Sequence, residues 1–361
     1  MTAYIVFLVI IVLEWLFMFP GARVTFGQEI EYRQRKRFLI IVCMEMICFA
    51  GFRATDLGAD TGIYVQALKH YASLPHNEII KAKLIWPYDF EAGYFMLTKL
   101  AGWLSMNETT FLFLIAILIY VPVYWFVLQY SENPLLSILT YFTFLFGYSI
   151  GIFRQMIALS IVLLGTKYMW ERKFIKYLIT VGIAMTFHTT AIIVLPLYWI
   201  CRIKLENKLK WIFAGEAICF FFARALVLLA VRLVPMYSGY VSGVYDVQGG
   251  SYSMLILLNI VMVAGFILER KEENRENLTL RMSVNAVVIA VFLQIVGYSM
   301  GIFGRIVPYY SVYLIILIPF LLNRYFRKNV IFVHVMGVVV LVALFCFFTV
   351  GSVIDPYQFV F

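Results

Sequence analysis

Charged side chains are scarce in this sequence: they account for 14% of the 361 residues, whereas 63% are hydrophobic. A soluble domain is about 25% charged and about 45–50% apolar, so this composition excludes a water-soluble fold. The mean hydropathy is +0.90, and runs of about 20 apolar residues, long enough to cross a bilayer as a helix, recur along the chain. The sequence therefore predicts a polytopic all-α membrane protein, in which residues 1–361 form a single integral membrane domain.

Metal-binding motifs are missing as well. The five cysteines lie in or at the ends of apolar segments, and none belongs to a CxxC or Cys/His cluster. Free cysteines in such segments usually serve as small buried hydrophobic side chains. We therefore expect no disulfide framework, no metal site and no cofactor.

The net charge of +9 does not indicate a nucleic-acid partner, because of where the charge lies. Twenty of the 29 basic residues fall in short loops at 23–37, 167–176, 202–210, 269–281 and 324–328. Cytoplasmic loops of membrane proteins carry this excess of Lys and Arg. Placing these loops inside makes residues 53–109 and 232–252 external, where we expect them to face substrate.

The apolar runs predict about ten full spans, over residues 2–19, 38–52, 110–130, 135–153, 154–170, 211–231, 253–268, 283–302, 306–323 and 330–350. Residues 177–201 lie between two basic loops and are too short to cross twice as full helices. We expect a broken or re-entrant helix pair there, with the break near Thr186–Thr190 and His188 facing an aqueous pocket. Residues 90–106 are short and contain Lys99, which favours an amphipathic helix in the outer interface.

One short pattern occurs twice: Gly147–Gln155 reads GYSIGIFRQ, and Gly297–Arg305 reads GYSMGIFGR. With the basic loops inside, Arg154 and Arg305 both lie at outward turns between two helices. An arginine near hydrocarbon usually has an anionic partner or an aqueous cavity, and its fork of donors suits phosphate oxygens. The repeat therefore predicts a shared anion site for a lipid pyrophosphate. The alternative is that each side chain snorkels to the outer headgroups.

Further candidate groups lie in the outer loops and in the broken helix. Carboxylates in the loop Phe52–Tyr64 can act as a base, as a cation site or as acceptors for sugar hydroxyls, although a solvated loop cap is the alternative. Glu91 can do the same or only stabilise the start of its helix, and His188 is either a catalyst or a packed side chain. The catalytic candidates are Asp60, Glu91 and His188, and which of them is the base stays open. The candidates for binding substrate are Arg53, Asp56, Tyr64, Arg154, Gln155, Arg305 and Tyr309.

Three segments together resemble the EpsG family of bacterial exopolysaccharide proteins, which are similar to Wzy-type polysaccharide polymerases. They are FRATDLGADTGIY at 52–64, FEAGY at 90–94, and the run at 153–198, which begins with FRQMIALS, contains MTFHTTAI and ends with IVLPLY. The resemblance covers roughly residues 1–325 and places Arg53, Asp60, Glu91, Arg154 and His188 on positions characteristic of the family. It implies a membrane glycosyltransferase that joins repeat units carried on undecaprenyl pyrophosphate, at the outer face of the bacterial cytoplasmic membrane.

On this reading the arginines neutralise the leaving pyrophosphate, so we expect a metal-independent enzyme. Its expected partners are the lipid-linked oligosaccharide, membrane lipid, and a chain-length regulator and a flippase of the same pathway. A flippase or transporter of the lipid-linked oligosaccharide is the alternative function, because transporters also use cavity arginines and internal repeats. The repeat here is one motif rather than half of the chain, and the candidate groups gather outside, which favours the enzyme.

Overall fold

The computed structural model describes residues 1–19, 32–74, 90–104, 106–205, 207–233, 251–326 and 330–360. Throughout those ranges the regular structure is helical, with one isolated β-bridge between Arg53 and Phe359. The prediction of an all-α fold is confirmed. Most of the predicted external loop 232–252, and residues 75–89 of the loop 53–109, lie outside the described residues.

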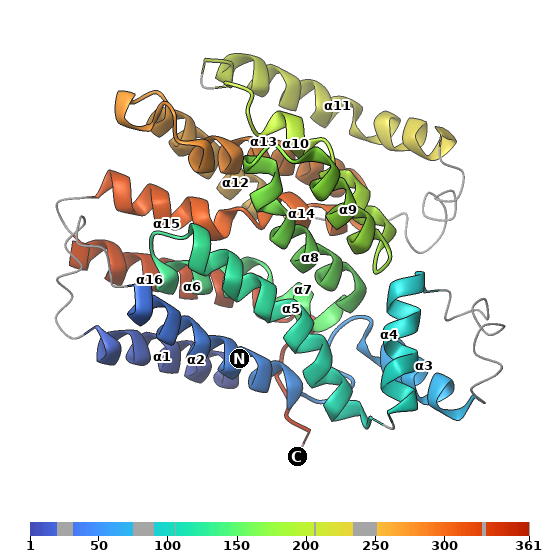
Figure 1. The fold of residues 1–361 in the computed structure, drawn as a ribbon. Helices are drawn as coiled ribbons and strands as arrows, with labels where there is room; N and C mark the ends of the chain where they lie inside the picture. Colours follow the sequence, from blue (N-terminus) through green and yellow to red (C-terminus); the bar gives the residue numbers. More distant parts are fainter. Residues whose placement is uncertain are drawn as a thin grey trace. The chain divides into compact units, whose positions relative to one another are not determined.

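The helices form two compact units, Met1–Leu195 with Tyr325–Phe361 and Pro196–Arg324, and each is described here by itself. In the first unit α2 packs against α5, α5 against α8, and α8 against α9, while α6 packs against α16 and α3 against α4 (Figure 1). Asn107 and Asn133 accept hydrogen bonds from the first turns of α5 and α6 and so fix where these helices begin. The helices of this unit are α1 Thr2–Met18, α2 Tyr32–Gly51, α3 Thr61–Ser73, α4 Ala92–Trp103, α5 Glu108–Tyr130, α6 Pro134–Phe144, α7 Phe146–Gly151, α8 Phe153–Trp170, α9 Phe174–Met185, the 3₁₀ helix η2 Thr189–Val194 and α16 Val330–Thr349.

In the second unit α13 is the central helix, since it packs against α11, α12, η6 and α14. Asn277 and Ser251 cap the starts of α13 and α12. The helices of this unit are α10 Leu197–Ile200, α11 Leu209–Leu233, α12 Tyr252–Glu269, η5 Glu272–Asn274, α13 Leu278–Ser299, η6 Gly301–Ile306, α14 Pro308–Ser311 and α15 Leu314–Tyr325.

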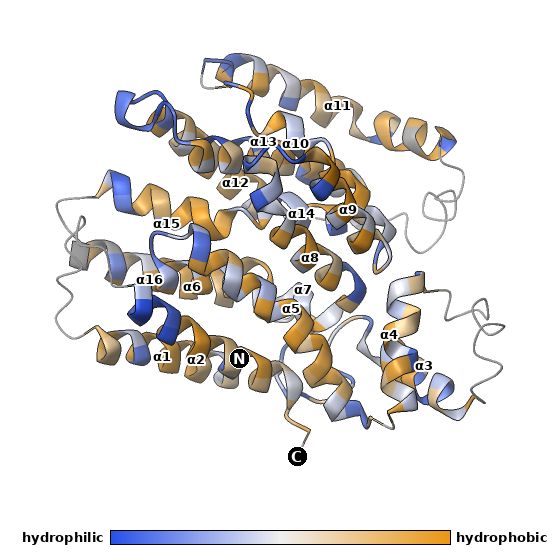
Figure 2. Cartoon of the chain, in the orientation of Figure 1, coloured by the Kyte–Doolittle hydropathy of each residue, from blue (hydrophilic) through white to orange (hydrophobic). Residues whose placement is uncertain are grey.

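The prediction of about ten full spans is not confirmed. Among the described residues four helices, α5, α11, α12 and α13, are long and apolar enough to cross a membrane, and the pair Phe303–Ser311 and Leu314–Tyr325, bent by 50°, gives a fifth if it counts as one span. Hydropathy does not register helix breaks: the apolar run 135–153 is divided at Leu145 into α6 and α7. The helices are nevertheless hydrophobic along most of their length, with hydrophilic residues at helix ends and connections (Figure 2), as a membrane protein requires.

The irregular segments lie where the sequence predicted them. After α9 ends at Met185 the chain breaks, and His188 precedes the short helix η2, so the predicted break near Thr186–Thr190 is confirmed. The separate short helix α4 occupies the predicted interfacial segment; its place in the interface stays a prediction. Both copies of the repeated pattern also interrupt a helix, at Ile152 between α7 and α8 and at Met300 between α13 and η6.

Candidate active site

The carboxylate of Glu91 joins three segments of the first unit. Its Oε2 accepts a hydrogen bond, 2.5 Å long, from Nη1 of Arg154, which lies in the first turn of α8. Its Oε1 contacts His188 Nδ1 at 2.9 Å and accepts from the backbone N–H of Thr189 at 3.1 Å. The three side chains are partly enclosed, with 14% of Glu91, 22% of Arg154 and 23% of His188 exposed. We call Glu91, Arg154 and His188 the Glu91 cluster.

Glu91 reaches these partners because it does not cap its own helix. It occupies the N-cap position of α4, yet its side chain accepts no hydrogen bond from the first turn of that helix. Its side chain therefore makes no capping hydrogen bond to α4, although its charge does lie at the N-terminus of that helix. Its charge also offsets the unfavourable position of Arg154, a cation at the N-terminal end of α8, where the helix dipole disfavours positive charge.

A close backbone approach holds α4 against the broken helix. The N–H of Gly93 donates to the carbonyl of Thr186 at 2.7 Å, and the N–H of Tyr94 donates to the same oxygen at 3.4 Å. A Cβ on Gly93 would lie 2.4 Å from Thr186 Oγ1 and 2.8 Å from that carbonyl oxygen, so any larger residue forces the two segments apart. Gly93 thus sets the distance between Glu91 and His188.

Aromatic rings surround the guanidinium of Arg154. It lies 4.8 Å from the ring centroid of Phe90 and 6.0 Å from that of Tyr64, distances at which a cation is attracted to a ring face. Tyr64 is in turn stacked on Phe153 at 4.7 Å. The Nε of Arg154 is buried and has no hydrogen-bond partner among the described residues. Arg154 thus donates one terminal nitrogen to Glu91 and also forms a hydrogen bond with Tyr64.

The environment of Glu91 determines its protonation. Burial alone would raise its pKa, but the hydrogen bond from His188 and the charge of Arg154 outweigh burial and lower the pKa to about 2. An ionised carboxylate only accepts hydrogen bonds, so Nδ1 of His188 must be the donor. In a neutral imidazole with that tautomer, the lone pair is on Nε2. No hydrogen bond to Nε2 is present within the described ranges. The arrangement is that of a histidine oriented by a carboxylate, with its basic nitrogen available.

Comparison with known proteins decides the family. The model of the EpsG family matches residues 36–359, almost the whole chain. The chain belongs to the EpsG family. Membership indicates a membrane protein of polysaccharide biosynthesis. No curated protein and no solved structure matches the chain.

This EpsG protein brings together three of the residues predicted from its sequence, Glu91, Arg154 and His188. Tyr64 packs beside them, 3% exposed, and Gln155 is 4% exposed in the turn of α8 next to Arg154. The sequence did not single out Gly93, Phe90 or Thr186 as parts of the site. The motifs FEAGY and TFHTT contain all three. The signal that could have identified the close approach is Gly93, a glycine in the first turn of a helix.

The loop between α2 and α3 contains the remaining first-unit candidates. Asp56 is exposed, and Asp60 is half-buried in the N-cap position of α3, with its N–H bonded to the carbonyl of Gly151 at 3.2 Å. Arg53 is 1% exposed, and its terminal nitrogens donate to the carbonyls of Ala50 and Ile150. Two of its terminal nitrogens are thus taken up by carbonyls, and the prediction that Arg53 contacts substrate stays a prediction.

Arg305 and Tyr309 belong to the second unit. Arg305 is exposed on η6, and Tyr309 is fully buried in α14. A clamp made by Arg154 and Arg305 together stays a prediction. Within the described residues no group of three or more His, Cys, Asp or Glu side chains is placed to hold a metal ion, and metal independence likewise stays a prediction.

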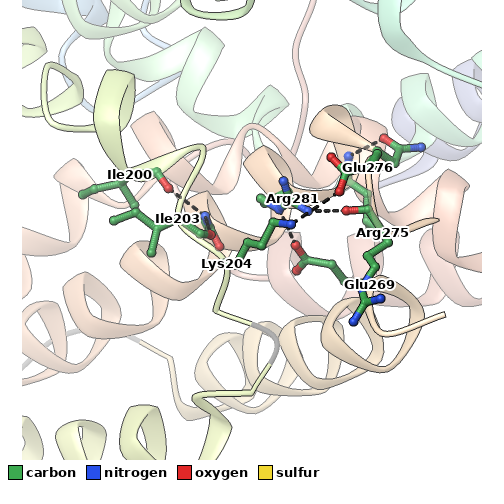
Figure 3. Close-up of polar contacts among 10 residues, drawn as sticks. Ile200, Ile203, Lys204, Glu269, Arg275, Glu276 and Arg281 are labelled. Carbon is green, nitrogen blue, oxygen red and sulfur yellow. Dashed lines mark hydrogen bonds and ion pairs between the residues drawn. The ribbon is translucent and has the colours of Figure 1, made fainter. Parts of the chain in front are cut away.

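A second Glu–Arg pair closes the connection between α12 and α13 in the second unit. Arg281 Nε donates to Glu269 Oε1 at 2.7 Å, and Arg281 Nη2 donates to the carbonyl of Arg275 (Figure 3). Nearby, Lys204 Nζ lies 3.4 Å from Glu276 Oε1. Only 7% of the Arg281 side chain and 1% of the Glu269 side chain are exposed. This pair fixes the connection between α12 and α13, and unlike the Glu91 cluster it contains no imidazole that could accept a proton.

Proposed function

We propose that this protein is a polysaccharide polymerase that transfers sugar chains between polyprenyl-pyrophosphate carriers. The observation that supports the proposal best is the Glu91 carboxylate shared by Arg154 and His188. It combines an oriented base with a cation in a partly enclosed site, which is what activating a sugar hydroxyl and stabilising a departing pyrophosphate require. Family membership and the apolar helices support the membrane setting.

In the proposed reaction His188 is the general base. Its Nε2 removes the proton from the acceptor hydroxyl, whose oxygen forms a bond to the anomeric carbon of the donor chain. The bond from that carbon to the pyrophosphate oxygen breaks, and the lipid pyrophosphate leaves with the electron pair. Glu91 holds the imidazole ring through Nδ1 and stabilises the imidazolium that forms, the role of a carboxylate behind a catalytic histidine. Asp60, the third catalytic candidate, then has a place in binding the sugar.

Arg154 stabilises the charge that develops on the leaving group. One of its terminal nitrogens is committed to Glu91, so the pyrophosphate is bound by the other donors of the fork. Arg305 is the second cation of the proposed clamp. Because guanidinium groups supply the positive charge, the proposed reaction uses no metal ion.

The proposed setting is the outer face of the bacterial cytoplasmic membrane. There the substrate is an undecaprenyl-pyrophosphate-linked oligosaccharide delivered by a flippase, and a chain-length regulator acts with the polymerase. The products belong to the exopolysaccharide, capsule or O-antigen class.

The test uses the full-length protein in lipid nanodiscs with a synthetic polyprenyl-pyrophosphate oligosaccharide. We expect a ladder of lengthened, lipid-linked products from the wild type and a strongly reduced yield from His188→Ala. A matched vesicle assay follows movement of the same substrate across the bilayer. Movement without lengthening would overturn the polymerase proposal in favour of a flippase.

A further inference from the structure

The loop between α2 and α3 caps the end of α7, directly before the helix that carries Arg154. The carbonyl of Ile150 accepts from Arg53 Nη2 at 3.1 Å and from Thr61 Oγ1 at 3.1 Å. The carbonyl of Gly151 accepts from the N–H of Asp60 at 3.2 Å. The last carbonyls of a helix have no partner within the helix, so this loop satisfies groups that the break between α7 and α8 exposes.

Arg53 contacts both sides of that break. It binds the Ile150 carbonyl on the α7 side, and its guanidinium lies 5.0 Å from the ring centroid of Phe153, the first residue of α8. Arg154 is the next residue along the chain. Enclosing an arginine to 1% exposure is costly unless its donors are used. Here Nη1 donates to the carbonyl of Ala50 in α2 and Nη2 to that of Ile150 in α7, and the contact with α8 is made through the ring of Phe153.

The loop and the break also approach each other closely. Gly58 has a φ of +106°, a conformation that favours glycine, and a Cβ at this position would lie 2.9 Å from both Gly151 Cα and the Ile150 carbonyl oxygen. A Cβ on Gly151 would lie 3.2 Å from the backbone nitrogen of Ala59. Gly151, the second glycine of the repeated pattern, therefore has a concrete role in the first copy, which is to admit this loop.

The C-terminal segment 357–360 fixes the backbone on both sides of Arg53. The N–H of Ala54 donates to the carbonyl of Gln358 at 2.8 Å, and the N–H of Val360 donates to the carbonyl of Phe52 at 2.9 Å. The hydroxyl of Tyr357 donates to the carbonyl of Phe49. A continuous series of contacts thus runs from segment 357–360 through Arg53 to Ile150 and Phe153.

From these contacts we infer that Arg53, supported by segment 357–360, is a positioning residue of the active site. It holds the break between α7 and α8 so that Arg154 reaches Glu91, and Glu91 in turn orients His188. Arg53 acts through Ile150 and Phe153 and does not touch the substrate. Where activity is the readout, the inference rests on the proposed function. Where the readout is the distance between Glu91 and Arg154, it rests only on the geometry of the first unit.

The first experiment measures steady-state chain extension by Arg53→Met, which keeps the length of the side chain and removes its donors. We expect kcat to fall about tenfold to hundredfold, while KM stays within about twofold of wild type. Arg53→Lys, which can serve one carbonyl, should recover part of the lost kcat. Arg35→Met is the matched control, because Arg35 also donates to a backbone carbonyl, that of Ser131, at the other end of α2. A raised KM with unchanged kcat, or no change at all, would overturn the inference.

A second experiment needs no activity. In a background without the native cysteines, Glu91→Cys and Arg154→Cys are joined by a short bifunctional thiol reagent. Adding Arg53→Met, or deleting residues 357–361, should strongly reduce the yield of this cross-link, and an unchanged yield would contradict the inference. If the wild type makes no product ladder, the proposed function fails while the cross-link yield still decides the role of Arg53.

If Arg53→Met does not fold, Thr61→Val takes its place. This variant removes one donor to Ile150 and preserves side-chain shape, so it should reduce the cross-link yield in the same direction but less.

Discussion

Two Glu–Arg pairs, one in each compact unit, show how differently the same chemistry is used. Glu269 and Arg281 are almost fully enclosed, and the second donor of Arg281 goes to a backbone carbonyl of the same connection. Glu91 and Arg154 are more open, and the second oxygen of Glu91 goes to His188 and the Thr189 N–H. The described contacts of the Glu269–Arg281 pair are all with neighbouring protein groups. The Glu91–Arg154 pair contacts an imidazole, that of His188, whose Nε2 is available. The difference predicts that one pair matters for stability and the other for reaction rate.

The largest expected effect comes from removing the available nitrogen. His188→Ala should lower the rate of chain extension by about 10²–10⁴-fold, the usual contribution of a general base, while insertion and folding persist. The matched control is His334→Ala, which removes a histidine whose Nε2 lies 2.7 Å from Nδ2 of Asn133. Added imidazole should restore part of the activity of His188→Gly. Equal losses in the His188 and His334 variants would mean that His188 is structural.

Neutralising each glutamate tests the comparison directly. Glu91→Gln should cost about 10²-fold or more in kcat, because the amide no longer stabilises an imidazolium. Glu269→Gln leaves Arg281 buried without its counter-ion, which should lower the free energy of unfolding by about 3–5 kcal/mol with normal activity per folded molecule. Thermal melting in nanodiscs and product ladders from the same preparations separate the two effects. A Glu269→Gln variant with a lower rate of chain extension but an unchanged melting temperature would contradict the distinction between the two pairs.

Widening the contact beneath Glu91 should have an intermediate effect. Gly93→Ala brings a Cβ to within 2.4 Å of Thr186 Oγ1, so α4 must shift, at a cost of about 1–3 kcal/mol. The shift moves Glu91 relative to His188, and kcat should fall about tenfold. Gly182→Ala, on the adjacent helix α9, is the matched control because its Cβ would meet nothing within 4 Å. Similar melting temperatures and rates for the two variants would show that the close approach is unimportant.

The sequence could predict which residues belong to the cluster but not how they connect. Ionisable groups such as Arg154 and His188 stand out in apolar surroundings, so hydropathy and motif spacing were enough to identify them. The bridge through Glu91 joins positions 63 and 97 residues apart, and no local pattern encodes such contacts. The enclosure of Arg53 could not be predicted for the same reason. The local sequence of an arginine after an apolar helix is the same whether the side chain faces water or is enclosed by a distant segment such as 357–360. The number of spans is not confirmed for a related reason: the break at Leu145 leaves no trace in composition.

The smallest expected effect is the acid dependence of stability. The pKa of Glu91 would be raised by burial, but His188 and Arg154 lower it from 4.5 to about 2. A carboxyl whose pKa is depressed in the folded state contributes stability that is fully present above its unfolded value and is lost as the pH falls through the folded value. The difference in melting temperature between wild type and Glu91→Gln should therefore shrink progressively between about pH 4.5 and pH 2. A difference that vanishes already at pH 6 would mean that Glu91 is protonated near neutrality, and it would then be a candidate for the base in place of His188.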